Sequence, residues 1–95
     1  MVSTRSSEAE QIKRDFGRRV RALRKVSGIS QMALAHAARL DPTYISAVEQ
    51  GRRNVSLVNI HALAAALSVS PRELFPDAPM PTSITVDQTS GAPVD

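Results

Sequence analysis

Four small or polar residues recur at helical spacing within one short segment of the sequence. Counted from the first, they lie at i, i+3, i+4 and i+7, and they are Thr43, Ser46, Ala47 and Gln50. A helix would therefore place them on one face. Hydroxyls can donate or accept hydrogen bonds, a Gln amide can make a two-pronged contact to adenine, and an Ala methyl can meet a thymine methyl. This face predicts contacts to base edges in a DNA groove, although an ordinary solvent-exposed helix face is the alternative for these residues taken alone.

Residues that suit DNA phosphates flank this segment. Gln31 opens an earlier predicted helix, where its side chain and the free backbone N–H groups can meet a phosphate. The run Arg52-Arg53-Asn54 follows the segment and would hold the flanking DNA backbone from a loop. Ser56 and Asn59 would add phosphate contacts through the start of the next predicted helix. A solvated loop pair is the alternative for the two arginines.

The charge of the chain is unevenly distributed, which favours a polyanionic partner. The 95 residues contain 12 Lys and Arg against 9 Asp and Glu. Residues 1–75 hold 12 basic and 6 acidic side chains, a net charge of +6, whereas residues 76–95 hold three acidic side chains and no base. Most of the basic residues are Arg, which suits bidentate binding to phosphate or guanine. A basic body with an acidic tail predicts double-stranded DNA as a partner, with the tail as a repulsive gate.

The composition also argues against other classes of function. There is no cysteine, so neither a disulfide framework nor a thiolate metal site is expected. His36 and His61 fall on different predicted helices without paired carboxylates, so no metal site is expected. The sequence shows no phosphate-binding glycine loop and no nucleophile–base constellation, and we expect neither an enzyme nor a cofactor. No signal peptide or membrane span is evident, which predicts a cytoplasmic protein, associated with the nucleoid when bound to DNA.

Apolar periodicity and capping residues predict an all-α fold with five helices. The first runs from Glu8 to a stop at Gly28, with one apolar and one basic face: Ile12, Phe16, Val20 and Leu23 against Arg14, Arg18, Arg21 and Lys25. Ser30, Asp41 and Ser56 are predicted N-caps of the next three helices. Inward-facing residues of these are Leu34, Ala35 and Ala38, then Ile45 and Val48, then Leu57, Ile60, Leu63, Ala64 and Leu67. A capping box at Ser70-Pro71-Arg72-Glu73 predicts a short fifth helix ending at Phe75.

Two terminal segments are predicted to flank this domain, which covers residues 8–75. Residues 1–7 are polar and Ser-rich, and we expect a flexible N-terminus. Residues 76–95 hold four prolines and few large apolar groups, so burial cannot offset the entropy of ordering them. A disordered or extended tail is the favoured interpretation, and docking of Ile84 to Val86 on a partner subunit is the alternative.

The segment from Phe16 to Phe75 resembles Cro/C1-type (Xre-family) helix-turn-helix proteins. The motifs that carry the resemblance are GISQ, ALAHAA, YISAVEQGRRN and LAAALSVSPRELF. The resemblance implies a five-helix, lambda-repressor-like bundle that works as a homodimer on a roughly palindromic operator. The stretch DPTYISAVEQGRRNVSL is most similar to controller proteins of restriction–modification systems and related small regulators.

Carried over by position, the resemblance places Gln31 on phosphate and Thr43, Ser46, Ala47 and Gln50 in the groove. It places Arg52, Arg53 and Asn54 on phosphate or a groove edge, and Tyr44 between the core and the DNA backbone. Glu49 is implied to be structural, with an arginine such as Arg24 as its partner. Arg39 stands where the family's turn usually holds Gly, so the turn must accommodate a side chain, which could itself contact phosphate.

Affinity considerations predict a dimer. One recognition helix reads only a few base pairs, whereas two-fold pairing places two such helices about one DNA turn apart. The apolar residues of the last two predicted helices exceed the need of one small core, and we expect an interface among Leu67, Val69, Leu74 and Phe75. The alternative is that all four belong to the intramolecular core.

The leading hypothesis is a sequence-specific transcriptional regulator that binds a palindromic operator as a homodimer. The alternative is the antitoxin of a toxin–antitoxin pair, which would bind its toxin through the Pro-rich tail and also bind DNA. Partners considered besides DNA and a second copy are a toxin and RNA polymerase.

Overall fold

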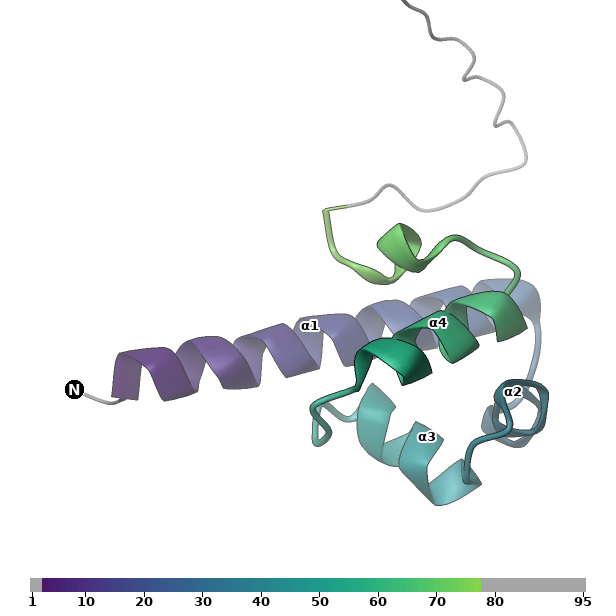
Figure 1. Cartoon of the computed structure of the whole chain (residues 1–95), viewed down its shortest axis with the longest axis horizontal. Helices are drawn as coiled ribbons and strands as arrows, with labels where there is room; N and C mark the ends of the chain where they lie inside the picture. Colours follow the sequence, from purple (N-terminus) through teal and green to yellow (C-terminus); the bar gives the residue numbers. More distant parts are fainter. Residues whose placement is uncertain (1–2, 78–95) are drawn as a thin grey trace, which may run out of the picture.

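The computed structural model describes residues 3–77, and these form a small helical bundle. The elements are α1 (Ser3–Ser27), α2 (Gln31–Ala38), α3 (Pro42–Glu49), α4 (Leu57–Ala66) and the 3-10 turn η1 (Pro71–Leu74) (Figure 1). No strand occurs between residues 3 and 77, so the all-α prediction is confirmed for that range. Within the same range, no helix is both long and apolar enough to cross a membrane. The predicted tail, residues 76–95, lies outside the described residues from 78 onwards.

Three of the predicted N-caps form the expected hydrogen bonds. The side chain of Ser30 accepts from the Ala33 backbone N–H at 3.0 Å, that of Asp41 from Thr43 at 2.7 Å, and that of Ser56 from Asn59 at 3.1 Å. Each cap satisfies one of the N–H groups that a helix start leaves without a partner. Local sequence therefore determines where α2, α3 and α4 begin.

The predicted fifth helix is wrong in type. Ser70 makes no side-chain capping bond, and the segment that follows is a single 3-10 turn. Its closure is a backbone bond from the Glu73 N–H to the Ser70 carbonyl, three residues apart at 3.0 Å. Pro71 suits this start because it has no N–H to satisfy, but the run of helix formers is too short to extend into an α-helix. The bundle has four α-helices, not five.

All four α-helices end in the same backbone motif, with a left-handed residue after the last turn. These residues are Gly28, Arg39, Gly51 and Ser68, with φ values of 74°, 60°, 77° and 58°. After α2, the Arg39 N–H donates to His36 and the Leu40 N–H donates to Ala35, a Schellman closure. The turn between α2 and α3 therefore accommodates Arg39 in a conformation that glycine adopts more easily.

Helix α1 is longer than the periodicity predicted. It begins at Ser3 rather than Glu8, so residues 3–7 are helical and do not form the separate segment expected there. Its N-terminal half extends past the other helices (Figure 1). Ile12 lies on this extension and is 65% exposed, which corrects its assignment to the buried stripe. Leu57 is similarly 72% exposed, because the first turn of α4 begins outside the core.

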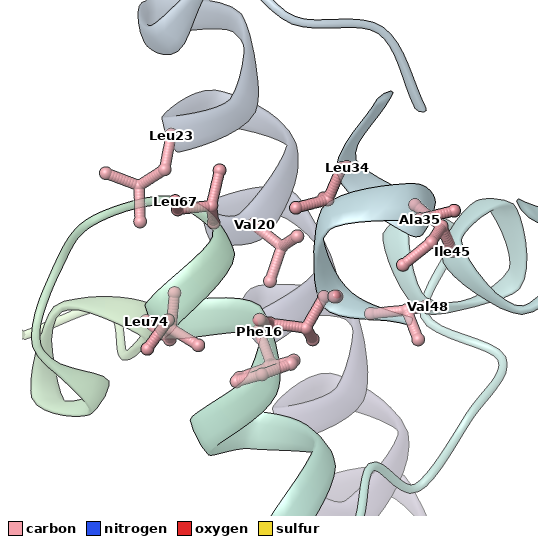
Figure 2. Packing of buried hydrophobic residues seen from close by; sticks show 12 residues of the cluster. Phe16, Val20, Leu23, Leu34, Ala35, Ile45, Val48, Leu67 and Leu74 are labelled. Atoms are coloured by element: carbon pink, nitrogen blue, oxygen red, sulfur yellow. The ribbon is translucent and has the colours of Figure 1, made fainter. Parts of the chain in front are cut away.

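The core lies where α1, α2, α3, α4 and η1 converge (Figure 2). Its fully buried members include Val20, Leu23, Leu34, Ile45, Val48, Leu63 and Leu74. Leu67 and Leu74, predicted at a dimer interface, are 5% and 0% exposed and belong to this core. The turn after α4 folds η1 back onto the bundle. Leu67 and Leu74 are therefore intramolecular core residues, which was the alternative to the dimer interface.

Gly17 allows α1 and the end of α3 to approach each other closely. A Cβ atom at this position would collide with the carbonyl oxygen of Val48 and would lie 2.9 Å from that of Glu49. Both obstacles are backbone atoms, so no side chain can rotate to make room. The absence of a side chain at Gly17 therefore determines how near α3 lies to α1.

We predict that Gly17→Ala lowers the free energy of unfolding by about 1–3 kcal/mol through this overpacking. Thermal and urea denaturation followed by circular dichroism would measure it. The direction of the stability change is informative, because Ala in a helix interior otherwise stabilises a protein by about 1 kcal/mol relative to Gly. A more stable variant would show that the approach of the two backbones is not a constraint.

Candidate nucleic-acid interface

Helix α3 separates a buried face from an accessible one. Ile45 and Val48 are 0% and 1% exposed, and they fix the helix against the core. Thr43 and Gln50 are exposed, whereas Ser46 and Ala47 are half-buried. The four candidate base-reading residues therefore share the accessible side of α3, and the two smaller ones are less exposed to solvent than the two larger ones. Their contact with bases stays a prediction.

Two of these candidates contact each other. The Gln50 amide nitrogen donates to the Ser46 hydroxyl at 2.9 Å, one helical turn apart. This bond orients the amide along the helix and leaves its carbonyl oxygen and its second N–H available to a ligand. The spacing of the two residues predicted a shared face, but not this bond.

A buried ion pair anchors the C-terminal end of α3. The Arg24 guanidinium from α1 donates to both carboxylate oxygens of Glu49, at 2.6 and 3.0 Å. The two side chains are 11% and 3% exposed. The hydrogen bond to Glu49 raises the pKa of Arg24 above its usual value, against the opposing effect of burial. The structural role expected for Glu49 is confirmed.

The same ion pair extends to the start of α2. Arg24 donates a further hydrogen bond to the Ile29 carbonyl at 2.9 Å, and the Gln31 amide donates to Glu49 at 3.0 Å. The side chain of Gln31, predicted to meet a phosphate, is thus engaged within the protein. The backbone N–H groups at the start of α2 remain the groups best suited to a phosphate there.

A second network holds the loop that follows α3. The Asn59 amide donates to the Tyr44 hydroxyl at 3.1 Å, and the Arg53 guanidinium lies 4.6 Å from the centre of the Tyr44 ring. Cation–π contact of this kind fixes the direction of a long side chain. Three predicted backbone-contact residues are therefore brought together, with α3 linked to α4 through Tyr44.

The other predicted contact residues lie around these two networks. Arg52 and Asn54 are exposed in the loop, and Ser56 caps α4. Arg39 is exposed at the opposite end of α3 from that loop. The structure thus brings Thr43, Ser46, Ala47 and Gln50 between Arg39 on one side and the Arg52-Arg53-Asn54 loop on the other.

Sequence reasoning missed one residue that positions this surface. Gly17 lies inside a helical pattern, where an isolated glycine usually has a packing reason, and that was the available signal.

No group of three or more His, Asp or Glu side chains suited to a metal occurs in the described part of the chain.

We predict that Glu49→Gln lowers the free energy of unfolding by about 3–5 kcal/mol, because it leaves the buried Arg24 charge without its counter-ion. Because the pKa of Arg24 is raised in the folded protein, the stabilisation by the ion pair is present at neutral pH. It is lost only as the pH rises through the raised pKa. Urea denaturation at pH 7 would measure the loss. The double variant Arg24→Met/Glu49→Leu should lose less stability than the sum of the losses in Arg24→Met and in Glu49→Leu. Strict additivity of the two losses would show that the groups act independently.

Comparisons with known proteins agree with this geometry. Residues 15–75 match the helix-turn-helix domain family. The chain is 45% identical over 67 residues to the control protein C.MunI of Mycoplasma sp, an alignment covering 70% of this chain and 90% of that protein. It is 48% identical over 61 residues to the control protein C.BamHI of Bacillus amyloliquefaciens, covering 63% and 75% respectively.

Solved structures show the same likeness. The restriction-modification controller protein C.AhdI from Aeromonas hydrophila matches with a TM-score of 0.65 and 55% sequence identity, over 65% of this chain and 94% of that chain. The sequence match and the arrangement of α2, the left-handed turn at Arg39 and α3 lead to one conclusion. The chain belongs to the helix-turn-helix domain family.

Proposed function

We propose that the chain is a DNA-binding transcriptional regulator that acts as a homodimer on a palindromic operator. The observation that carries the proposal is the accessible side of α3, which presents small polar groups between cationic segments while its other side is fixed in the core. The control and controller proteins that the chain resembles support the same class, and we propose a restriction–modification controller role for it.

In this role, α3 enters the major groove with Thr43 near its leading end. Gln50 and Thr43 are the exposed polar groups, and they would carry most of the base discrimination through hydrogen bonds. Ser46 and Ala47 are half-buried, so they would let the helix approach closely and contact only what comes near its axis. Two of the four residues would thus discriminate between bases, and the other two would allow the close approach of the helix.

The DNA backbone would be held on both sides of the groove. Arg52, Arg53 and Asn54 would contact one strand, with Arg53 directed by the Tyr44 ring. Arg39 and the N–H groups at the start of α2 would contact the other. The start of α4, capped by Ser56 and tied through Asn59 to Tyr44, would add a further dipole aimed at phosphate. These contacts position the protein but do not specify the sequence.

We predict that Arg52→Ala weakens binding to all DNA sequences and reduces the slope of log affinity against log salt by about 1. Fluorescence anisotropy at several salt concentrations would measure both. Arg72→Ala is the matched control, since it removes the same charge from η1, on the other side of α4 from α3 (Figure 1). An equal loss in both variants would indicate that only net charge matters.

We predict that Gln50→Ala changes the preferred base at one position of each half-site by about 1–3 kcal/mol, with little change in the salt slope. Selection of bound sequences from random DNA, run in parallel on the wild type and this variant, would reveal the position. Thr43→Ala should alter a different position. If the wild type, Gln50→Ala and Thr43→Ala all selected the same sequences, the accessible side of α3 would not be the surface that contacts the bases.

A further inference from the structure

The side chain of Asn59, predicted to contact phosphate directly, is bonded within the protein. Its amide nitrogen donates to the Tyr44 hydroxyl oxygen at 3.1 Å, across 15 residues of sequence. Its backbone N–H donates to the Ser56 side chain as part of the cap of α4. Asn59 is half-buried in this position. The bond to Tyr44 therefore joins the first turn of α4 to the first turn of α3.

The bond from Asn59 leaves the proton of the Tyr44 hydroxyl available. A phenolic hydroxyl can accept one hydrogen bond and donate another, and an amide N–H engages only its oxygen. No group within residues 3–77 accepts the Tyr44 proton. Tyr44 is half-buried, and the polar capacity that it leaves unused is that of a donor. A ligand that binds at this hydroxyl must therefore supply an acceptor atom.

Arg53 adds a cation at the ring that carries this hydroxyl. Its guanidinium carbon lies 4.6 Å from the centre of the Tyr44 ring. No Asp or Glu carboxylate within residues 3–77 forms an ion pair with Arg53. A guanidinium has five N–H donors, and attraction to the face of a ring does not use them. Tyr44 and Arg53 together thus present hydrogen-bond donors and one positive charge.

That combination matches a phosphate of the DNA backbone. A phosphodiester offers acceptor oxygens and a negative charge, and a hydrogen bond to a charged oxygen is about twice as strong as a neutral one. The edges of bases carry no net charge, so they would leave the charge of Arg53 uncompensated. Tyr44 also differs from the base-reading candidates, because it is tied to α4 and packs against the core. Phosphate is therefore the acceptor that the pair favours.

We propose that Asn59 is a positioning residue that directs the Tyr44 proton to a DNA phosphate, which Arg53 also contacts. This inference rests on the proposed function, and it replaces the direct phosphate contact expected of Asn59. An amide N–H has no lone pair to accept the phenolic proton, so that proton must turn away from Asn59. The same bond polarises the hydroxyl, because hydrogen bonds in a chain strengthen one another by roughly 10–30%. The phosphate then meets a donor that is already oriented.

In this arrangement, the effects of Asn59 and Tyr44 on DNA binding are coupled. Because Asn59 acts only through the hydroxyl, removing it has no effect once the hydroxyl is absent. Two side chains that each touched the DNA would instead give losses of affinity that multiply. The coupling therefore distinguishes positioning from direct contact.

A double-mutant cycle tests this coupling by fluorescence anisotropy on the DNA that the wild type selects. We expect Tyr44→Phe, which keeps the ring beside Arg53, to weaken binding about 10-fold, and Asn59→Leu to weaken it about 3- to 5-fold. The double variant should bind as Tyr44→Phe does, and losses that multiply would overturn the proposal. His61→Leu is the matched control, since it changes an exposed polar residue of the same helix and should bind like the wild type.

Asn59→Asp separates the effect on binding from any effect on folding. A carboxylate can only accept, so it would take the Tyr44 proton and deny it to the phosphate. An acidic residue in the first turn of α4 suits the helix dipole, so the free energy of unfolding should not fall. We expect a larger loss of affinity than the same change causes in the Tyr44→Phe background, where only the added charge acts. Equal losses in the two backgrounds would contradict the proposal.

Two further outcomes separate this inference from a structural role and from the proposed function. Asn59→Leu should keep the wild-type base preference, because phosphate contacts do not specify sequence. Wild-type affinity in both Asn59 variants, with only their stability changed, would assign Asn59 to the fold alone. Losses that multiply on a selected sequence would refute the role of Asn59 and leave the regulator standing, whereas a wild type that selects no sequence would refute the proposed function itself.

Discussion

The Arg24–Glu49 pair is the interaction on which the arrangement of the helices depends. It lies where α1, the start of α2 and the end of α3 meet, and both partners are nearly removed from water. Taking two charges out of water is costly, and a buried pair is tolerated only where its remaining polar atoms are also bonded. Here Ile29 and Gln31 supply those bonds. The pair therefore requires three chain segments to be in place together, and it specifies one orientation of α3.

Two further constraints act on the same helix from other directions. Gly17 allows the α3 backbone to lie against α1, and Tyr44 links the first turn of α3 to Arg53 and to α4 through Asn59. A reading surface must be held closely to discriminate between bases, and side chains fixed by such supporting contacts achieve that. The accessible side of α3 can thus vary with little effect on its position, because none of these three constraints uses that side.

Local features of the fold were predictable from the sequence, and long-range ones were not. Ser30, Asp41 and Ser56 act within three residues of themselves, so their capping roles follow from the sequence alone. Periodicity placed Ile12 and Leu57 in buried stripes, yet both are exposed because a stripe does not reveal where the neighbouring helix ends. Leu74 was assigned to an interface because the fold-back of η1 onto α1 and α4 has no local signature. The Glu49 partner was implied by family resemblance, whereas the Tyr44–Asn59 bond, across 15 residues, had no signal in the pattern.

The hydrogen bond between Gln50 and Ser46 bears on how such a protein would search a genome. In the proposed role, the amide has a partner of its own at every site where the correct base is absent. At a mismatched site one N–H of the amide keeps its partner, and only the carbonyl oxygen and the second N–H lose theirs, so the penalty for passing over unrelated DNA is smaller. The correct base binds the carbonyl oxygen and the second N–H, so the bond to Ser46 persists and keeps the amide oriented for that contact. The bond between the two side chains would therefore ease passage over unrelated DNA without weakening the contact at the correct base.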